Sequence, residues 1–507
     1  MNKVLRGEVP SLILIFVFSL LFLSIGLDKV GEHWDEVTVA SVGESYLGFI
    51  KNEDFSQSSW ELNHEHPPVA KYIYGTARFL TKNIPILQDK SGYYPEGRDF
   101  LFARFFSVVM SSLTVLVLFM IGFQISKSRL VAGLVALLLF INPVFQSYAR
   151  IVSLEVPLLL FGSLFVLYSL KYASKKSLKN YFAVVISFAL LVGTRYNGLL
   201  LLPFFYILQL HYLSNNSNWT NLSNLKSLIM PVLSGVLLII IWPYLWSSPV
   251  SGVLASADRG LEVHTREYFL GKLGNAPWFY YISYLLVKTP LTLLALFIFG
   301  IVGGFKKTKQ VVVFALLLFL LPFAASFLPL KQDGLRYVNL YLIGFSVICA
   351  FGVIGVIGVI RSMGIKIVIL ASTFLLLIIS LTNHFPNYLD YYNYFIPVVD
   401  IYSKRLFEIG GWGEGVLEAV KKLPKPQDGQ TSKVYFAISP VHIIPNLPDG
   451  FIETGDFSQA DFVLINTNYR WYDGLVSNSD LERFTVIKRI TVGNFIELVS
   501  VYQKLPI

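Results

Sequence analysis

Residues 11–36 read SLILIFVFSLLFLSIGLDKVGEHWDE, an apolar run followed directly by a charged stretch. The run from 10 to 27 contains no charged residue and has the length that a membrane-spanning helix needs, about 17–25 residues. No small-residue cleavage site follows it, so we interpret it as a retained helix rather than a signal peptide. The polar stretch beyond it contains Trp34-Asp35-Glu36 and then Asn63-His64-Glu65-His66. Acids, histidines and aromatic residues beside a bilayer indicate polar chemistry on a lipid-borne substrate.

The composition predicts a polytopic membrane protein. Hydrophobic residues make up 54% of the 507 residues and charged residues only 14%, and a soluble protein of this size could not keep so much apolar surface from water. The net charge of +9 would suggest nucleic acid as a partner of a soluble protein. Here the basic residues flank apolar runs, as the positive-inside rule describes, so we expect a lipid bilayer and no nucleic acid as the partner.

Eleven apolar runs have the character of membrane spans. The fifth and sixth are short and separated only by Arg195, Tyr196 and Asn197, so they could instead form one long helix. The eleven runs are 10–27, 101–124, 129–146, 153–171, 180–194, 197–213, 228–247, 286–304, 310–328, 336–360 and 364–382.

Charge orients these predicted spans. If the N-terminus is cytoplasmic, the segments on the inner side carry many lysines and arginines and a single acid, Glu8. The loops 28–100 and 248–285 and the C-terminal tail are then external. We therefore predict a multi-pass protein of the plasma membrane whose active site lies on the extracytoplasmic face.

We divide the chain into a transmembrane catalytic domain, 1–385, and an external domain, 386–507. Within the first loop, Val37–Phe49 and Val69–Leu80 have apolar residues at helical spacing and predict interfacial helices. The tail is predicted to form a small α/β domain, with a helix after the glycine-rich turn near 410. Its strands are expected at Val434–Ile438, Phe462–Ile465, Phe484–Ile487 and Phe495–Tyr502.

Two adjacent carboxylates, Asp35 and Glu36, are the candidate catalytic residues. Sugar transfer from a phosphate carrier needs a base that takes the proton of the attacking hydroxyl, and one carboxylate is enough for an inverting displacement. The competing interpretation is that an Asp-Glu pair after a membrane helix only caps the next helix.

Histidines and acids in both predicted external loops could bind a divalent metal. His64, Glu65 and His66 lie in the first loop, and Glu262 and His264 lie in the second. Such ligands suit zinc or manganese, and a cation there, magnesium included, would stabilise a phosphate leaving group. The alternative is that these histidines bind phosphate directly or cap a helix.

Several basic residues lie near the predicted external face and could bind a lipid phosphate, although most such residues only extend their charge to the interface. Arg150 and Arg336 stand between apolar runs, where an unpaired charge is costly. Glu155 could be a structural partner for Arg150. The basic residues that we select for substrate binding are Lys71, Arg104, Arg150, Arg195, Lys288 and Arg336.

The ordered series of motifs resembles the GT-C glycosyltransferases of the protein O-mannosyltransferase type and the related bacterial aminoarabinose transferases. The resemblance covers most of the chain. It is carried by Trp34-Asp35-Glu36, Glu65-His66-Pro67-Pro68-Val69-Ala70-Lys71, Ala103-Arg104-Phe105, Asn142-Pro143, Ala149-Arg150, Thr194-Arg195-Tyr196-Asn197-Gly198, Trp242-Pro243-Tyr244, Pro277-Trp278-Phe279, Lys288-Thr289-Pro290, Arg336-Tyr337 and Trp412-Gly413-Glu414-Gly415.

The resemblance implies a polyprenyl-phosphate sugar donor and an inverting mechanism, with Asp35 as the base. Glu65 and His264 match metal-binding positions of the aminoarabinose branch. His66 stands where that branch has a phosphate-binding lysine, and Tyr337 joins the substrate-binding set beside Arg336.

The predicted function is an integral-membrane glycosyltransferase that moves a sugar from a polyprenyl-phosphate carrier to a hydroxyl of a protein, lipid or glycan. The alternative is a polytopic transporter or flippase for lipid or solute, which would place ionisable residues near the middle of the bilayer and show repeat symmetry. The apolar runs here are nearly free of charge at their centres, which favours surface chemistry. A scaffold that has lost activity is the third interpretation, and Asp35 argues against it.

Overall fold

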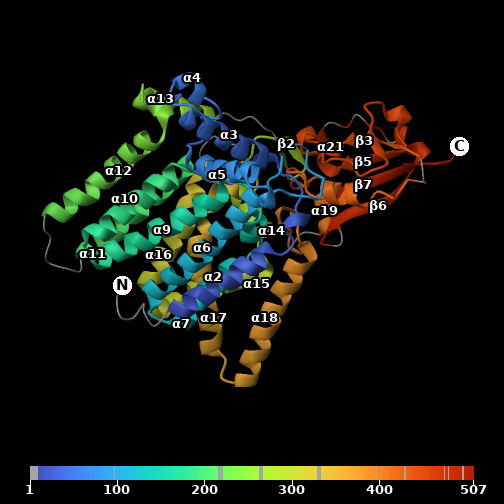
Figure 1. Cartoon of the computed structure of the whole chain (residues 1–507). Helices are drawn as coiled ribbons and strands as arrows, with labels where there is room; N and C mark the ends of the chain where they lie inside the picture. The colour runs from blue at the N-terminus through green and yellow to red at the C-terminus, as the bar shows by residue number, and fades with distance from the viewer. Residues whose placement is uncertain are drawn as a thin grey trace.

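The computed structural model describes residues 9–95, 98–214, 221–261, 267–327, 333–395, 397–426, 430–472, 474, 476–477, 479–493 and 496–506. Long helices make up its larger part, and a mixed β-sheet packs at one end of them (Figure 1).

Each of the eleven predicted spans contains a helix. These helices are α2 (Val9–Ser24), α6 (Leu101–Ser126), α7 (Arg129–Phe140), α8 (Pro143–Ala149), α9 (Glu155–Ser174), α10 (Leu178–Val192), α11 (Leu202–Ser214), α12 (Asn221–Ile241), α14 (Tyr280–Lys288), α15 (Leu291–Lys307), α16 (Lys309–Leu320), α17 (Tyr341–Val359) and α18 (Met363–His384).

Fewer than eleven of these helices are both long enough and apolar enough to cross a bilayer. Within the described residues, six helices are long and apolar enough to cross a bilayer, and two bent helix pairs raise the number to eight. The helices α10 and α12 are apolar but shorter. The protein is therefore a multi-pass membrane protein, but the count of eleven spans is not confirmed. The fifth and sixth runs form two helices, separated at Gly193–Arg195 and by the 3-10 helix η3 (Tyr196–Leu201).

The two helices predicted in the first loop are present as α3 (Trp34–Lys51) and α5 (Val69–Asn83). They cross closely at two glycines: a Cβ on Gly43 would come within 2.0 Å of the Lys71 carbonyl oxygen, and one on Gly75 within 2.3 Å of the Gly43 backbone. Glycine permits this approach because it has no side chain. The crossing fixes the direction of α3, whose first turn carries Asp35.

The three regions predicted to be external pack together at one end of the helices (Figure 1). The first and second contact each other through Phe55 and Trp246, whose ring centroids are 5.1 Å apart. The first and third are joined by a hydrogen bond of 3.2 Å from the Trp34 backbone N–H to the Trp412 carbonyl. The helix α13 (Pro249–Leu261) and the hairpin of β1 (Glu267–Phe269) and β2 (Lys272–Gly274) complete this layer.

The tail contains a five-stranded sheet in the order β4-β3-β5-β7-β6. The strand β3 pairs in parallel with β4 and β5, whereas β7 pairs antiparallel with β5 and β6. The four predicted strands are present, and the short β4 is an addition. The elements are α20 (Val416–Lys421), β3 (Ser432–Ala437), β4 (Phe451–Glu453), β5 (Phe462–Asn466), α21 (Thr467–Tyr472), β6 (Phe484–Val492) and β7 (Ile496–Lys504).

Candidate active site

Asp35 lies in the first turn of α3 and reaches Arg336, which begins the 3-10 helix η6 (Arg336–Val338). Asp35 Oδ2 accepts a hydrogen bond from Arg336 Nη2, and the Asp35 side chain keeps 14% of its surface exposed. Burial raises the pKa of Asp35 above its ordinary value; Arg336 opposes that shift, and the charges of Glu155 and Asp333 add to it. A carboxylate with a raised pKa and access to solvent can accept a proton.

Arg336 joins three carboxylates in one network. Besides Asp35, its Nε lies 2.9 Å from Glu155 Oε1 and its Nη1 lies 2.6 Å from Asp333 Oδ2. Its guanidinium stacks 4.5 Å from the ring centre of Trp412, whose Nε1–H donates to Asp333 Oδ1 at 3.0 Å. Glu155, Asp333 and Trp412 thus fix the Arg336 guanidinium, which in turn holds Asp35.

Glu155, at the start of α9, does not pair with Arg150. Its Oε1 lies 2.5 Å from Arg195 Nη1 and also accepts from Arg336. The guanidinium of Arg195 lies 3.9 Å from the ring centre of Tyr337. Arg195 and Tyr337 therefore support the network around Arg336.

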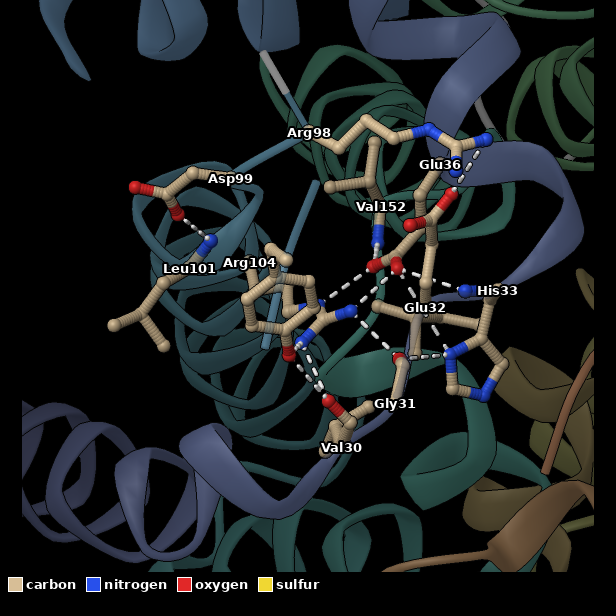
Figure 2. Close-up of polar contacts among 12 residues, drawn as sticks. Val30, Gly31, Glu32, His33, Glu36, Arg98, Asp99, Leu101, Arg104 and Val152 are labelled. Carbon is tan, nitrogen blue, oxygen red and sulfur yellow. Dashed lines mark hydrogen bonds and ion pairs between the residues drawn. The ribbon is translucent and has the colours of Figure 1, made fainter. Parts of the chain in front are cut away.

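Glu36 has a different environment from its neighbour Asp35. Figure 2 shows the polar contacts around Glu36. Its side chain is fully buried, and its two oxygens lie 2.8 Å from Nε and 2.6 Å from Nη2 of Arg104. The backbone N–H groups of His33 and Val152 also donate to Glu36, both at 3.0 Å. This saturated carboxylate caps α3 and ties it to α6 and to the segment before α9.

Arg150 follows α8 and differs from Arg104, Arg195 and Arg336, which all bind carboxylates. It is 2% exposed, and among the described residues it has no carboxylate partner. Its Nη1 donates to Gln146 Oε1 at 2.6 Å, and its Nε has no hydrogen-bond partner. Rings of Phe22, Phe385 and Tyr388 surround it, the nearest centre being that of Tyr388 at 5.5 Å.

Lys71 and His66 lie together at the start of α5. Lys71 is buried, donates to the carbonyl of His66 at 2.7 Å and also to that of Asn63, and faces the Tyr46 ring. Burial lowers the pKa of Lys71 to about 7, opposed by the charge of Glu65. The two hydrogen bonds of Lys71 thus fix the backbone of residues 63–66, which include the predicted metal ligand Glu65.

Of the two predicted metal ligands, Glu65 and His264, the structure describes only Glu65. Glu65 accepts from Asn63 Nδ2 at 2.7 Å, while Glu262 and His264 lie outside the described residues. In the described part of the chain, no group of three or more His, Cys, Asp and Glu is arranged to hold a metal ion.

Residues 12–249 match the family model described as dolichyl-phosphate-mannose-protein mannosyltransferase. This part of the chain is therefore similar to that family. A curated relative, the dolichyl-phosphate-mannose–protein mannosyltransferase 3 of Saccharomyces cerevisiae, is 25% identical over 166 residues, which are 32% of this chain and 21% of the yeast protein. The chain thus spans about a fifth of the length of that relative.

A solved structure, that of the S. cerevisiae protein O-mannosyltransferase Pmt1-Pmt2 complex bound to the sugar donor, covers 50% of this chain and 34% of the matched chain. The TM-score of that match is 0.38 and the sequence identity is 18%.

The matched region, 12–249, contributes Asp35, Glu36, Lys71, Arg104, Arg150, Glu155 and Arg195, whereas Asp333, Arg336, Tyr337 and Trp412 come from beyond it. Sequence reasoning missed Asp333, although its spacing of three residues from Arg336 was a visible signal for an ion pair. It also did not select as site residues Asp390, Glu408 and Glu414, which line, with Lys288 and Asp333 among others, a cavity of about 60 Å³.

A second cavity of about 220 Å³ is also lined by Asp333 and Trp412. The first turn of α3 contributes Trp34 to it, and the C-terminal domain contributes Ser439-Pro440 and Tyr472. The two cavities share Asp333, Glu408, Gly411 and Trp412. Two compartments therefore meet at the residues that hold Arg336.

Proposed function

We propose that this protein is an inverting glycosyltransferase that moves a sugar from a polyprenyl-phosphate carrier to an acceptor hydroxyl, with Asp35 as the base. The observation that carries the proposal is the partly exposed Asp35 carboxylate with its raised pKa, held by Arg336, whose partners Asp333 and Trp412 line two cavities. The matched family and the yeast relative are named for a dolichyl-phosphate mannose donor and a protein acceptor. These are the first pair of substrates to test.

In the proposed reaction, Asp35 accepts the proton of the acceptor hydroxyl as its oxygen attacks the anomeric carbon. The new carbon–oxygen bond forms on one face of the sugar, and the bond to the phosphate oxygen breaks on the other. The electron pair of that bond leaves with the polyprenyl phosphate, and the anomeric configuration inverts. Incubation of the purified protein with polyprenyl-phosphate mannose and a serine- or threonine-containing peptide, followed by mass spectrometry, tests this reaction.

Arg150 is the cation that we assign to the lipid phosphate. A buried guanidinium without a carboxylate partner is costly beside a bilayer, and a phosphate would supply the missing charge. Lys71 and Arg104 are less suited, because carbonyl groups already occupy Lys71 and Glu36 occupies Arg104. Arg195 and Arg336 share Glu155.

We expect Arg150→Gln to weaken binding of polyprenyl phosphate by about 10- to 100-fold, since a hydrogen bond to a charged group contributes about 1.5–3 kcal/mol. Equilibrium binding in detergent measures the effect. Arg361→Gln is the matched control, because Arg361 is exposed at the turn between α17 and α18. Equal affinity of Arg150→Gln and the unaltered protein would contradict the assignment.

The acceptor is proposed to approach Asp35 through the second cavity, whose walls come from α3 and the C-terminal domain. Trp34 is exposed at its rim and packs against His442, with ring centroids 4.7 Å apart. Ser439-Pro440 follows β3, and α21 follows its parallel neighbour β5. Binding sites commonly form at the carboxyl ends of parallel strands.

We expect Trp34→Ala to raise the KM for the acceptor by about 5- to 10-fold, the range for loss of an anchoring aromatic side chain. Donor affinity should stay unchanged, because the donor is proposed to bind on the other side of Trp412. Steady-state kinetics with each substrate varied in turn measures both. Trp278→Ala, at an exposed tryptophan outside this cavity, is the control, and an unchanged acceptor KM would reject this route.

The proposal places no metal in the reaction, because Asp35 supplies the base and Arg150 a positive charge for the phosphate. Elemental analysis of the purified protein, with Glu65→Gln as the comparison, tests the predicted Glu65–His264 site separately. The extracytoplasmic position of Asp35 is supported by the distribution of lysine and arginine in the sequence, and cysteine labelling at Asp54 or Asp456 tests it from either side of the membrane.

A further inference from the structure

The first cavity contains a buried carboxylate oxygen that the proposed mechanism does not use. Asp390 is 3% exposed; its Oδ1 accepts from the Gly410 backbone N–H at 2.9 Å, and its Oδ2 has no hydrogen-bond partner among the described residues. A buried carboxylate oxygen left unpaired is destabilising, because it has lost its contacts with water and gained no partner. Asp390 lines the cavity, so a ligand there could donate the missing hydrogen bond.

The charges in the cavity do not suit a phosphate. Its one lysine, Lys288, donates to the Leu389 carbonyl and lies 3.7 Å from the ring centre of Tyr392. The surrounding side chains include Asp390 and Glu414, and Glu414 is also buried. Carboxylates outnumber the cation, so the cavity favours a ligand that donates hydrogen bonds and carries no negative charge.

Aromatic rings form much of the remaining wall. Tyr148 from α8, Tyr284 from α14, Tyr388 and Tyr392 after α18, and Trp412 line the space. Flat apolar faces combined with a few fixed acceptors match a pyranose ring, which has apolar C–H faces and hydroxyl donors at its edge.

The position of the cavity connects the two halves of the proposed mechanism. Tyr388 is shared with the ring cage of Arg150, the proposed phosphate ligand. On another wall, Asp333 and Trp412 contact Arg336, which holds Asp35. A sugar in this cavity would lie between the phosphate that leaves and the base that activates the acceptor.

We propose that this cavity is the binding site for the donor sugar, a pyranose whose hydroxyl donates to Asp390 Oδ2, so that Asp390 and Glu414 select the sugar. The assignment rests on the proposed function for its donor, a sugar linked to a polyprenyl phosphate. It separates recognition of the sugar from recognition of the phosphate.

The test compares binding of two ligands, a polyprenyl phosphate and the same carrier bearing a hexose, to the full-length protein. We expect the hexose to improve the affinity of the unaltered protein. Asp390→Asn keeps the acceptor for Gly410 but replaces Oδ2 by an N–H donor. This variant should bind the hexosyl carrier about 10-fold or more weakly, and its affinity for the polyprenyl phosphate without the hexose should stay unchanged. Arg150→Gln should lower the affinity for both ligands. Asp480→Asn, at an exposed carboxylate in the C-terminal domain, should lower the affinity for neither.

If Asp390→Asn preserves the affinity ratio of the two ligands, or if the hexose adds no affinity to the unaltered protein, the cavity is not the sugar site. Glu414→Gln provides an independent second variant with the same expected pattern. Binding does not require turnover, so a protein that binds the hexosyl carrier in this way yet transfers no sugar would contradict the proposed function and leave the sugar site standing.

Discussion

Asp35→Asn is expected to abolish sugar transfer, lowering kcat by about 10²–10⁴-fold, the contribution typical of a general base. The amide cannot accept the acceptor's proton. It keeps the shape of the carboxylate, and its carbonyl oxygen can still accept from Arg336. Expression, thermal stability in detergent and donor affinity should therefore stay near those of the unaltered protein. Single-turnover transfer from a polyprenyl-phosphate sugar measures the effect.

The control for this variant is Asp54→Asn, a half-buried carboxylate elsewhere in the same loop that accepts hydrogen bonds from Ser56 and Ser59, which should transfer at the unaltered rate. Asp35→Glu keeps the base on a longer side chain and should retain part of the activity. Full turnover by Asp35→Asn would remove Asp35 from the mechanism.

The pH dependence of transfer follows from the same carboxylate. The protonated form of Asp35 cannot act as a base, so kcat/KM should rise as pH rises through its pKa and level off above it. Burial raises that pKa above its ordinary value, so the acid limb should lie above pH ~4, where an ordinary aspartate titrates. A flat profile down to pH ~4 would contradict the role of Asp35.

The sequence predicted the membrane class, the helices of the first loop and four of the five strands of the tail, because each has a local hydrophobic pattern. It also selected Asp35 and Arg336 as candidate site residues, a selection that stays a prediction. It could not predict that they pair, since 301 positions separate them and no local pattern encodes that contact.

The pairing of Asp35 with Glu36 as two catalytic residues shows a second limit. Consecutive residues of an α-helix point about 100° apart, because one turn takes 3.6 residues. Asp35 consequently reaches Arg336 beside the cavities, while Glu36 turns inward to Arg104. The sequence places the two acids side by side, but only the packing of α3 shows that their environments differ.

The basic residues show a third limit. Lys71, Arg104 and Arg150 read alike as cations beside apolar runs, and all three are buried. Carbonyl groups bind the first, a carboxylate binds the second, and the third has neither a carboxylate nor a full set of hydrogen bonds. Their partners come from distant segments, so the tertiary structure alone separates a structural cation from a candidate phosphate ligand.

Glu36→Gln is expected to destabilise the protein by about 3–5 kcal/mol, because it leaves the Arg104 guanidinium buried without a balancing charge. One of the two oxygens that now accept from Arg104, His33 and Val152 would become an N–H donor. Thermal unfolding in detergent measures the loss. Glu53→Gln is the control: Glu53 is an exposed carboxylate two residues after the end of the same helix, and exposed charges contribute at most about 1 kcal/mol.

The substitutions at Asp35 and Glu36 should therefore have different effects on activity and stability. Asp35→Asn should lose transfer and keep stability, whereas Glu36→Gln should lose stability first and transfer only as a consequence. The double variant Glu36→Gln with Arg104→Met should be more stable than the sum of the two single losses predicts, because removing both partners leaves no uncompensated charge. If Glu36→Gln unfolds at the temperature of the unaltered protein but fails to transfer sugar, then Glu36 acts in the reaction itself, and the assignment of the base to Asp35 alone is wrong.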